Sequence, residues 1–215
     1  MSERPDIALE KRERAAARLA SPSAARNKDV IAAALAEILP QNAHVLEIAS
    51  GTGEHALACV SARPDITWTP SEPDGDSRAS VDAWAQDAPG RINPCQDIST
   101  TQDGWADAQA RVDAIFCANM IHIAPWRAAE GLFQGAAQCL AVGGLVCLYG
   151  PFQEGAATAP SNLEFDQSLK SRDPSWGVRA LSDVDGLAER CGFTRVERRD
   201  MPANNLLLVF QKSAP

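Results

Sequence analysis

A glycine-rich segment at residues 49–53, called the glycine turn below, is the part of the chain best suited to chemistry. Residues 51–56 read GTGEHA, which fits the pattern GxGxxG/A, with an apolar run before it and a helical pattern after it. Glycine permits a tight turn and lets a ligand approach bare backbone. Glu72, 19 residues after Gly53, would end the next strand and could accept hydrogen bonds from ribose hydroxyls. Taken alone, this pattern predicts a nicotinamide dinucleotide site.

Further carboxylates near the expected strand ends favour a different nucleotide. Glu47 lies in the strand before the turn and Glu54 begins the helix after it. Together with Glu72 they would repel a pyrophosphate but attract a ligand that carries an ammonium and a sulfonium. Asp97 follows the third expected strand and could accept a hydrogen bond from the adenine amine while Ile98 packs on the ring.

Strands and helices alternate along most of the chain, and this alternation would position those side chains. Apolar runs predict strands at residues 44–49, 66–69, 92–94, 112–118, 143–149, 193–201 and 206–212. Helical spacing and capping residues predict helices at residues 6–19, 23–39, 53–62, 75–87, 125–140 and 182–191. Such alternation predicts a parallel sheet with helices on both faces, and the last two strands predict an antiparallel hairpin. Ligands of open α/β sheets bind at the carboxyl edge of the strands.

The run EIASGTG, residues 47–53, resembles the first motif of class I S-adenosylmethionine (SAM)-dependent methyltransferases. Ala49, Gly51 and Gly53 match its small residues, with alanine in place of the first glycine, and Glu72 and Asp97 match the second and third acidic positions. The resemblance covers about residues 43–212. It implies an α/β, Rossmann-like fold whose seven-stranded, mostly parallel sheet has an antiparallel last strand, as the C-terminal hairpin also suggests. It implies SAM as the cofactor.

A narrower resemblance is carried by segments outside the glycine turn. They are SPSAARNK (21–28), NMIHIAPW (119–126), YGPF (149–152), Phe165-Asp166 with Leu169, RDPSWGVR (172–179) and MPANN (201–205). As a set they are similar to the methyltransferase-like twenty-six family, an uncharacterised family long labelled a domain of unknown function. This resemblance implies methyl transfer and supplies no acceptor.

The motifs and strand ends together predict a site at the carboxyl edge of the sheet. The residues expected to bind SAM are Glu47, Ala49, Ser50, Gly51, Thr52, Gly53, Glu72, Asp97, Ile98 and Asn119. His122 is the candidate general base, because histidine titrates near neutral pH, and Tyr149, the single tyrosine, is a candidate substrate contact. His44 and His55 are expected to be structural, at a strand start and on a helix surface.

The expected organisation is one domain in four parts. Residues 1–40 form a helical flap, in which Arg26 and Asn27 could cover SAM, and residues 41–150 form the SAM-binding core. Residues 151–179 break the alternation and are expected to be a lid over the substrate. Residues 180–215 supply the last helix and the hairpin. The acceptor-binding candidates in the lid are Asn162, Asp166, Arg172, Trp176 and Arg179.

Composition excludes several classes of protein. The chain has 215 residues, of which 45% are hydrophobic and 22% charged, as in ordinary globular domains. Its net charge of −8 disfavours a broad nucleic-acid surface. No apolar run approaches the roughly 20 residues of a membrane span, and no signal-peptide core begins the chain. The six cysteines lack metal-ligand spacing, so no metal is expected.

We therefore expect a cytoplasmic, SAM-dependent methyltransferase that acts on a small, polar or charged molecule. Its oligomeric state is not indicated by the sequence. Two alternatives remain open at this point. A nicotinamide-dependent oxidoreductase would use the same turn, and cofactor binding distinguishes it from a methyltransferase. A non-catalytic SAM-binding protein would bind the cofactor without turnover.

Overall fold

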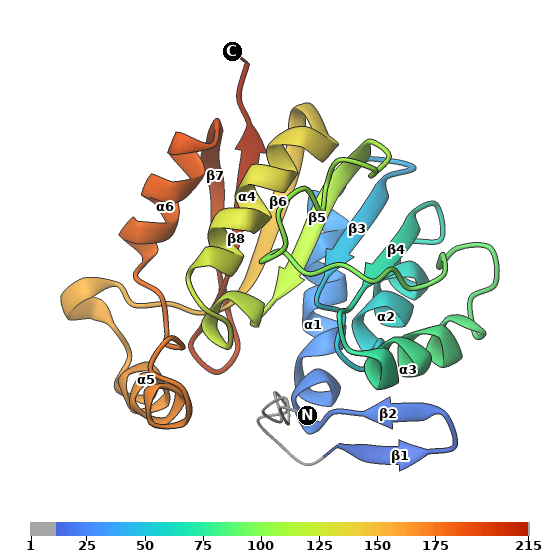
Figure 1. Ribbon diagram of the computed structural model, residues 1–215, viewed down its shortest axis with the longest axis horizontal. Coiled ribbons are helices and arrows are strands. Elements are labelled where there is room, and N and C mark those ends of the chain that lie inside the picture. The colour runs from blue at the N-terminus through green and yellow to red at the C-terminus, as the bar shows by residue number, and fades with distance from the viewer. Residues whose placement is uncertain (1–11, 215) are drawn as a thin grey trace.

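A six-stranded sheet forms the centre of the computed structural model, which describes residues 12–214 (Figure 1). Its strands are β3 (His44–Ile48), β4 (Thr67–Ser71), β5 (Val112–Ala118), β6 (Leu140–Pro151), β7 (Phe193–Met201) and β8 (Asn205–Lys212). They lie in the order β4-β3-β5-β6-β8-β7. The first four pair in parallel, whereas β8 is antiparallel to both β6 and β7. The predicted mostly parallel sheet with an antiparallel last strand is confirmed.

The expected strand at residues 92–94 is present only as an edge segment. Two isolated parallel bridges, Trp68 with Ile92 and Ser71 with Gln96, join it to β4. Pro94 has no N–H to donate, and the Cys95 N–H donates to an aspartate side chain on the neighbouring helix instead of to a strand. The seventh strand is therefore irregular, although the segment occupies the expected position beside β4.

Helices cover both faces of the sheet, as predicted. The helices are α1 (Pro22–Ile38), α2 (Glu54–Ala62), α3 (Gly75–Ala85), α4 (Arg127–Cys139), α5 (Pro160–Arg172) and α6 (Leu181–Arg190), with short 3-10 helices η1 (Met120–His122) and η2 (Gly155–Ala157). Of these, α5 covers neither face and lies beyond the carboxyl edge of the sheet (Figure 1). Leu132 of α4 and Leu187 of α6 belong to one core, and Leu35 of α1 and Val60 of α2 belong to another (Figure 1). No helix within residues 12–214 is long and apolar enough to cross a membrane.

The prediction of a helix at residues 6–19 is wrong for residues 12–19, which the structure describes. Residues 6–11 lie outside the described part. The rest forms a two-stranded hairpin of β1 (Glu13–Ala15) and β2 (Arg18–Ala20), whose turn includes Ala16 at a left-handed φ of +56°. The N-terminal flap is thus a hairpin followed by one helix, α1.

Contacts with α3 explain why this alanine-rich segment is not helical. Arg18 donates to both carboxylate oxygens of Asp87 at 2.8 and 2.6 Å, and its guanidinium lies 4.7 Å from the centre of the Trp84 ring. The Leu19 N–H donates to Ser80 Oγ at 2.7 Å, and the Leu19 carbonyl accepts from Trp84 Nε1 at 2.9 Å. These contacts use the backbone groups of Leu19 in an extended conformation, and they outweigh a weak helix propensity.

The lid segment, residues 151–179, contains a helix that the sequence pattern did not predict. The side chains that α5 buries are Asn162, Asp166 and Leu169, and two of these are polar. Asn162 Nδ2 donates to the carbonyls of Phe152 and Asn204 at 3.3 and 3.0 Å. Because α5 packs through polar contacts, it shows no apolar periodicity.

Candidate functional site

The glycine turn has a backbone that only small residues suit. Ala49, Gly51 and Gly53 have left-handed φ values of +58°, +59° and +96°. A Cβ on Gly53 would lie 2.7 Å from the Cα of Val81, so close packing of α3 requires glycine there. A Cβ on Gly51 would meet no atom of residues 12–214 within 4 Å. The space beside Gly51 is therefore open to a ligand.

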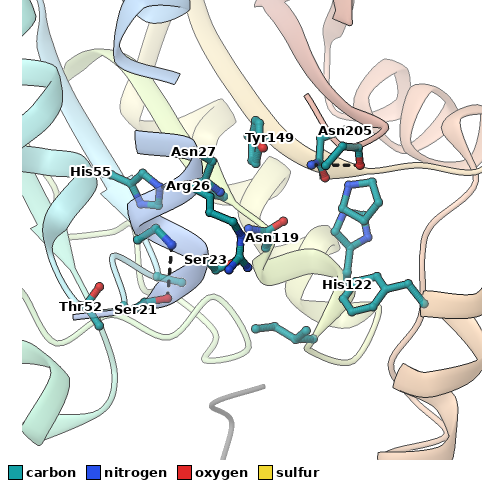
Figure 2. A pocket seen from close by; sticks show the side chains of 18 of the residues that line it. Ser21, Ser23, Arg26, Asn27, Thr52, His55, Asn119, His122, Tyr149 and Asn205 are labelled. Atoms are coloured by element: carbon teal, nitrogen blue, oxygen red, sulfur yellow. Dashed lines mark hydrogen bonds between the residues drawn. The ribbon is translucent and has the colours of Figure 1, made fainter. Parts of the chain in front are cut away.

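A cavity of about 480 Å³ lies over the turn and is bounded by the start of α1, the end of β6 and α5 (Figure 2). Its volume is within the range of small-molecule sites. Eight of the predicted site residues line it: Ala49, Ser50, Gly51, Thr52, Asn119, His122, Tyr149 and Asn162. Within residues 12–214, no group of three or more His, Cys, Asp or Glu side chains could hold a metal ion.

Glu47 lies behind the turn and does not line the cavity. Its side chain is 1% exposed and accepts a hydrogen bond from Trp68 Nε1 at 2.9 Å. Burial raises the pKa of this carboxyl to about 7, against the opposing hydrogen bonds of Trp68 and Ser50. Ser50 both bonds Glu47 and lines the cavity, so a contact of Glu47 with the cofactor, directly or through water, stays a prediction.

Glu72 lies beside the turn, at the end of β4. Its carboxylate accepts from the Gly51 N–H at 3.0 Å and from the Asp74 N–H at 3.2 Å. Burial raises the pKa of this carboxyl, which is half-buried and outside the cavity lining. Glu72 thus stabilises the turn in this structure, and its contact with a ribose stays a prediction.

Asp97 and Ile98 lie at the edge segment, away from the cavity. The Asp97 side chain is 68% exposed and forms an ion pair with Arg78 at 3.2 Å. Ile98 is buried in the core on the α4 side of the sheet. A contact of Asp97 with adenine stays a prediction, whereas Ile98 has little surface left to offer a ring.

His122 is buried in η1 and lines the cavity. The Arg179 N–H donates to its Nδ1 at 3.4 Å, which assigns the ring proton to Nε2, and within residues 12–214 Nε2 has no hydrogen-bond partner. Burial, assisted by the positive charge of Arg179, lowers the pKa of His122 to about 3. This environment suits a neutral hydrogen-bond donor better than the general base that the sequence suggested. The adjacent Asn119 has a left-handed φ of +61°, and its carbonyl accepts from the His122 N–H at 3.0 Å.

The start of α1 is fixed to the glycine turn by Glu54. This buried carboxylate accepts from the Ser21 N–H at 2.8 Å and from Thr52 Oγ1 at 2.9 Å, and Lys28 lies 3.8 Å away. As a result Arg26 and other residues of the flap line the cavity.

His55 was expected on a helix surface, and this is wrong. It is 9% exposed, lines the cavity and bonds Asn27 Oδ1 through Nε2 at 2.9 Å. Sequence reasoning also did not find Arg12 and Asn205, which line the cavity from the hairpin and from β8. The position of His55 two residues after Gly53 was the one available signal, because residues that open a helix after such a turn lie close to its ligand.

Four of the five acceptor-binding candidates do not line the cavity. Asp166 accepts from a backbone N–H of the loop after α5 at 2.9 Å, and Trp176 is buried in a small cluster against α5. Arg179 donates to two carbonyls around η1 at 2.9 and 2.7 Å, and Arg172 is exposed at the end of α5. The contacts of Asp166, Trp176 and Arg179 hold the lid segment together, and acceptor binding by these four residues stays a prediction. Asn162 alone of the five reaches the cavity.

Several solved structures share this fold. Mitomycin 7-O-methyltransferase MmcR matches with a TM-score of 0.75 and 13% identity over 89% of this chain and 54% of its own. An O-methyltransferase family 2 protein from Planctomyces limnophilus DSM 3776, in complex with apigenin, matches with a TM-score of 0.74 and 16% identity. The match covers 88% of this chain and 60% of that protein. CalO1, a methyltransferase in calicheamicin biosynthesis solved in an SAH-bound form, matches with a TM-score of 0.72 and 14% identity. The match covers 89% of this chain and 54% of CalO1. The chain spans little more than half of these proteins, and the likeness shows that it shares their Rossmann-like fold.

The sequence itself matches a protein family over residues 18–212, which is nearly the whole chain. The match includes the glycine turn, the start of α1 and the lid segment. The description of the family assigns no activity. The chain thus belongs to the family described as "Protein of unknown function (DUF938)".

Proposed function

We propose that this protein is a SAM-dependent methyltransferase that acts on a small molecule. The observation that carries the proposal is the glycine turn at the carboxyl edge of β3. Its Gly51 faces open space, and residues of α1 and α5 line the cavity over that space. The methyltransferase fold of the similar structures supports this proposal.

The residues around the turn fit SAM. Backbone at Gly51 is open to a ligand, and Glu72 and Asp97 follow the next two segments at the same edge, where they could bind a ribose and an adenine amine. Asn119 lines the cavity on the other side of the turn. SAM would supply an electrophilic methyl group at this position.

The chain's own contribution to methyl transfer is to orient the acceptor and exclude water. Alignment of two reactants can supply on the order of 7–11 kcal/mol of the barrier. A neutral donor such as the Tyr149 hydroxyl could hold an acceptor oxygen without removing its proton. The proposal therefore requires no strong base, and it favours an acceptor whose nucleophile is already unprotonated.

The size and lining of the cavity favour a small polar acceptor. Flap, turn and lid segment surround about 480 Å³, and asparagines 119, 162 and 205 contribute amide groups to the wall. A space of this size suits a small molecule. A cytoplasmic location and kinship with the methyltransferase-like twenty-six family belong to the same proposal.

Two measurements test the proposal. Calorimetry with SAM, S-adenosylhomocysteine, NAD and NADP should give heat with the first two only. Incubation with methyl-labelled SAM and fractionated cell metabolites should then yield a labelled small molecule. Heat from NAD or NADP, with none from SAM, would favour an oxidoreductase. Binding of SAM with no labelled product in any fraction would favour a non-catalytic SAM-binding protein.

A further inference from the structure

Three side chains from different elements form a hydrogen-bonded chain along one wall of the cavity. His55 of α2 bonds Asn27 Oδ1 of α1 through Nε2 at 2.9 Å, and the Asn27 side chain bonds the hydroxyl of Tyr149 of β6. All three residues line the cavity, and Figure 2 shows Asn27 between the other two. A buried polar chain of this kind fixes the orientation of each member.

The directions of these hydrogen bonds follow from the groups involved. Asn27 Oδ1 can only accept, so His55 donates from Nε2–H and is in its neutral form. Burial, with the nearby Lys28 charge, lowers the pKa of His55 to about 4, which agrees with a neutral ring. We assign the Asn27 amide N–H as the donor to the Tyr149 oxygen, because the contact lowers the pKa of Tyr149, against the larger effect of burial, as a donor to a phenol oxygen does.

Tyr149 is left with a proton to donate. Within residues 12–214, Asn27 is the one hydrogen-bond partner found for its hydroxyl, and the hydroxyl accepts in that contact. The side chain is almost fully buried by protein except on the cavity side. Its O–H is therefore available to an acceptor atom in the cavity.

The charge of the cavity wall indicates which acceptor atom fits. Arg12 and Arg26 line it, and none of its lining residues within the described range is Asp or Glu. This is unusual in a chain with 28 acidic and 20 basic residues. A wall with cationic groups and an oriented O–H donor suits an anionic oxygen.

We propose that His55 and Asn27 position the Tyr149 hydroxyl to donate a hydrogen bond to a ligand carboxylate in this cavity. The inference rests on the proposed function, in which the carboxylate belongs either to the amino-acid end of the cofactor or to the methyl acceptor. Tyr149 is then a specificity residue, and Asn27 and His55 are positioning residues.

The single tyrosine makes a direct test possible. Tyrosine labelled with ¹³C at Cζ gives one resonance for Tyr149 in the full chain, and this resonance moves when the hydroxyl donates to an anion. S-adenosylhomocysteine carries the amino-acid carboxylate, whereas 5′-methylthioadenosine lacks it. A shift with the first and none with the second assigns the carboxylate to the cofactor. A shift that appears only when small mono- and dicarboxylic acids are added to the S-adenosylhomocysteine complex assigns it to the acceptor.

Three variants distinguish the positioning of the Tyr149 hydroxyl by Asn27 from a general effect of added negative charge in the cavity. Tyr149→Phe should weaken binding of the ligand that shifts the resonance by about tenfold to hundredfold, as expected for a hydrogen bond to a charged group. Asn27→Asp keeps the acceptor for His55 but would capture the Tyr149 proton, so the resonance should no longer respond to that ligand. Ser23→Asp adds the same charge to the same cavity from the start of α1, farther from Tyr149 than Asn27 is in Figure 2, and the response should persist.

The outcomes distinguish this proposal from the proposed function. If S-adenosylhomocysteine binds but neither it nor any carboxylic acid shifts the Tyr149 resonance, the carboxylate proposal is overturned and the methyltransferase proposal stands. Equal loss of the response in Asn27→Asp and Ser23→Asp would overturn the positioning role of Asn27. Failure of SAM and S-adenosylhomocysteine to bind the unmodified protein would overturn both proposals.

Discussion

Replacement of Gly51 by alanine should weaken SAM binding by about tenfold to hundredfold while leaving the protein folded. The residue has a φ of +59°, and a Cβ there would project into open space next to the cavity. Forcing alanine into this conformation costs about 1–2 kcal/mol, which corresponds to a fall in Tm of about 2–8 °C for a chain of this size. The Gly51 N–H can still donate to Glu72, so the turn keeps its hydrogen bond.

The effect on binding follows from the space that the new methyl group takes. A ligand against bare backbone would overlap it, and a misfit of this kind costs about 1–3 kcal/mol, or about tenfold to hundredfold in Kd. Calorimetric titration with SAM measures this loss. Thermal unfolding without ligand measures the separate cost of the backbone conformation.

Gly155 provides a matched control for this variant. It has the same φ of +59°, and a Cβ there also meets no atom within 4 Å, but it lies in η2 outside the cavity lining. Gly155→Ala should lower Tm by the same few degrees and leave the Kd for SAM within about twofold. If Gly51→Ala binds SAM as tightly as Gly155→Ala does, no ligand approaches the backbone at Gly51 and the assignment of the site is wrong.

Three further predictions concern charges around the site. The raised pKa of Glu47 means that the folded state keeps a proton that the unfolded state loses between pH 4.5 and 7. Stability should fall by about 3 kcal/mol as pH rises through that window, and Glu47→Gln should abolish this fall in urea unfolding. The effect of His122 on the pH dependence of stability has the opposite sign, because only the unfolded state binds a proton at this residue as pH drops below 6.5. As pH falls from 7.5 to 5, this protonation should lower the free energy of unfolding by about 2 kcal/mol. An unchanged pH dependence of stability in His122→Gln would contradict this. Arg179→Ala should lower stability by about 2 kcal/mol, because carbonyls around η1 lose their donor, with the Kd for SAM unchanged within about twofold.

The strands and most helices could be predicted because their patterns are local. The strand expected at residues 112–118 is β5, and the helix expected at 23–39 is α1 with a shift of one residue. An apolar strand run or a helical stripe results from one face packed on the sheet, so the sequence carries it directly. The glycine turn was predictable for a similar reason, since its backbone conformation restricts residue type.

The β1–β2 hairpin and α5 could not be predicted because their determinants are distant in sequence. Arg18 pairs with Asp87, 69 residues away, and Asn162 bonds the Asn204 carbonyl, 42 residues away. Neither contact leaves a periodic pattern. The same holds for the cavity wall, where Asn27 meets His55 across 28 residues. The polar side chains of the lid segment, such as that of Arg179, form hydrogen bonds within the fold that sequence spacing does not reveal.

The structure changes the electrostatic reason for preferring SAM to a dinucleotide. In the sequence, three carboxylates near the turn were expected to repel a pyrophosphate. Glu54 instead anchors the start of α1, and Glu47 lies behind the turn with a pKa near the physiological range, so its charge is partly lost. Arginines line the cavity instead. The preference for SAM therefore rests on Glu72 beside the turn and on the antiparallel β8. The arginines that line the cavity instead favour a ligand that carries a carboxylate.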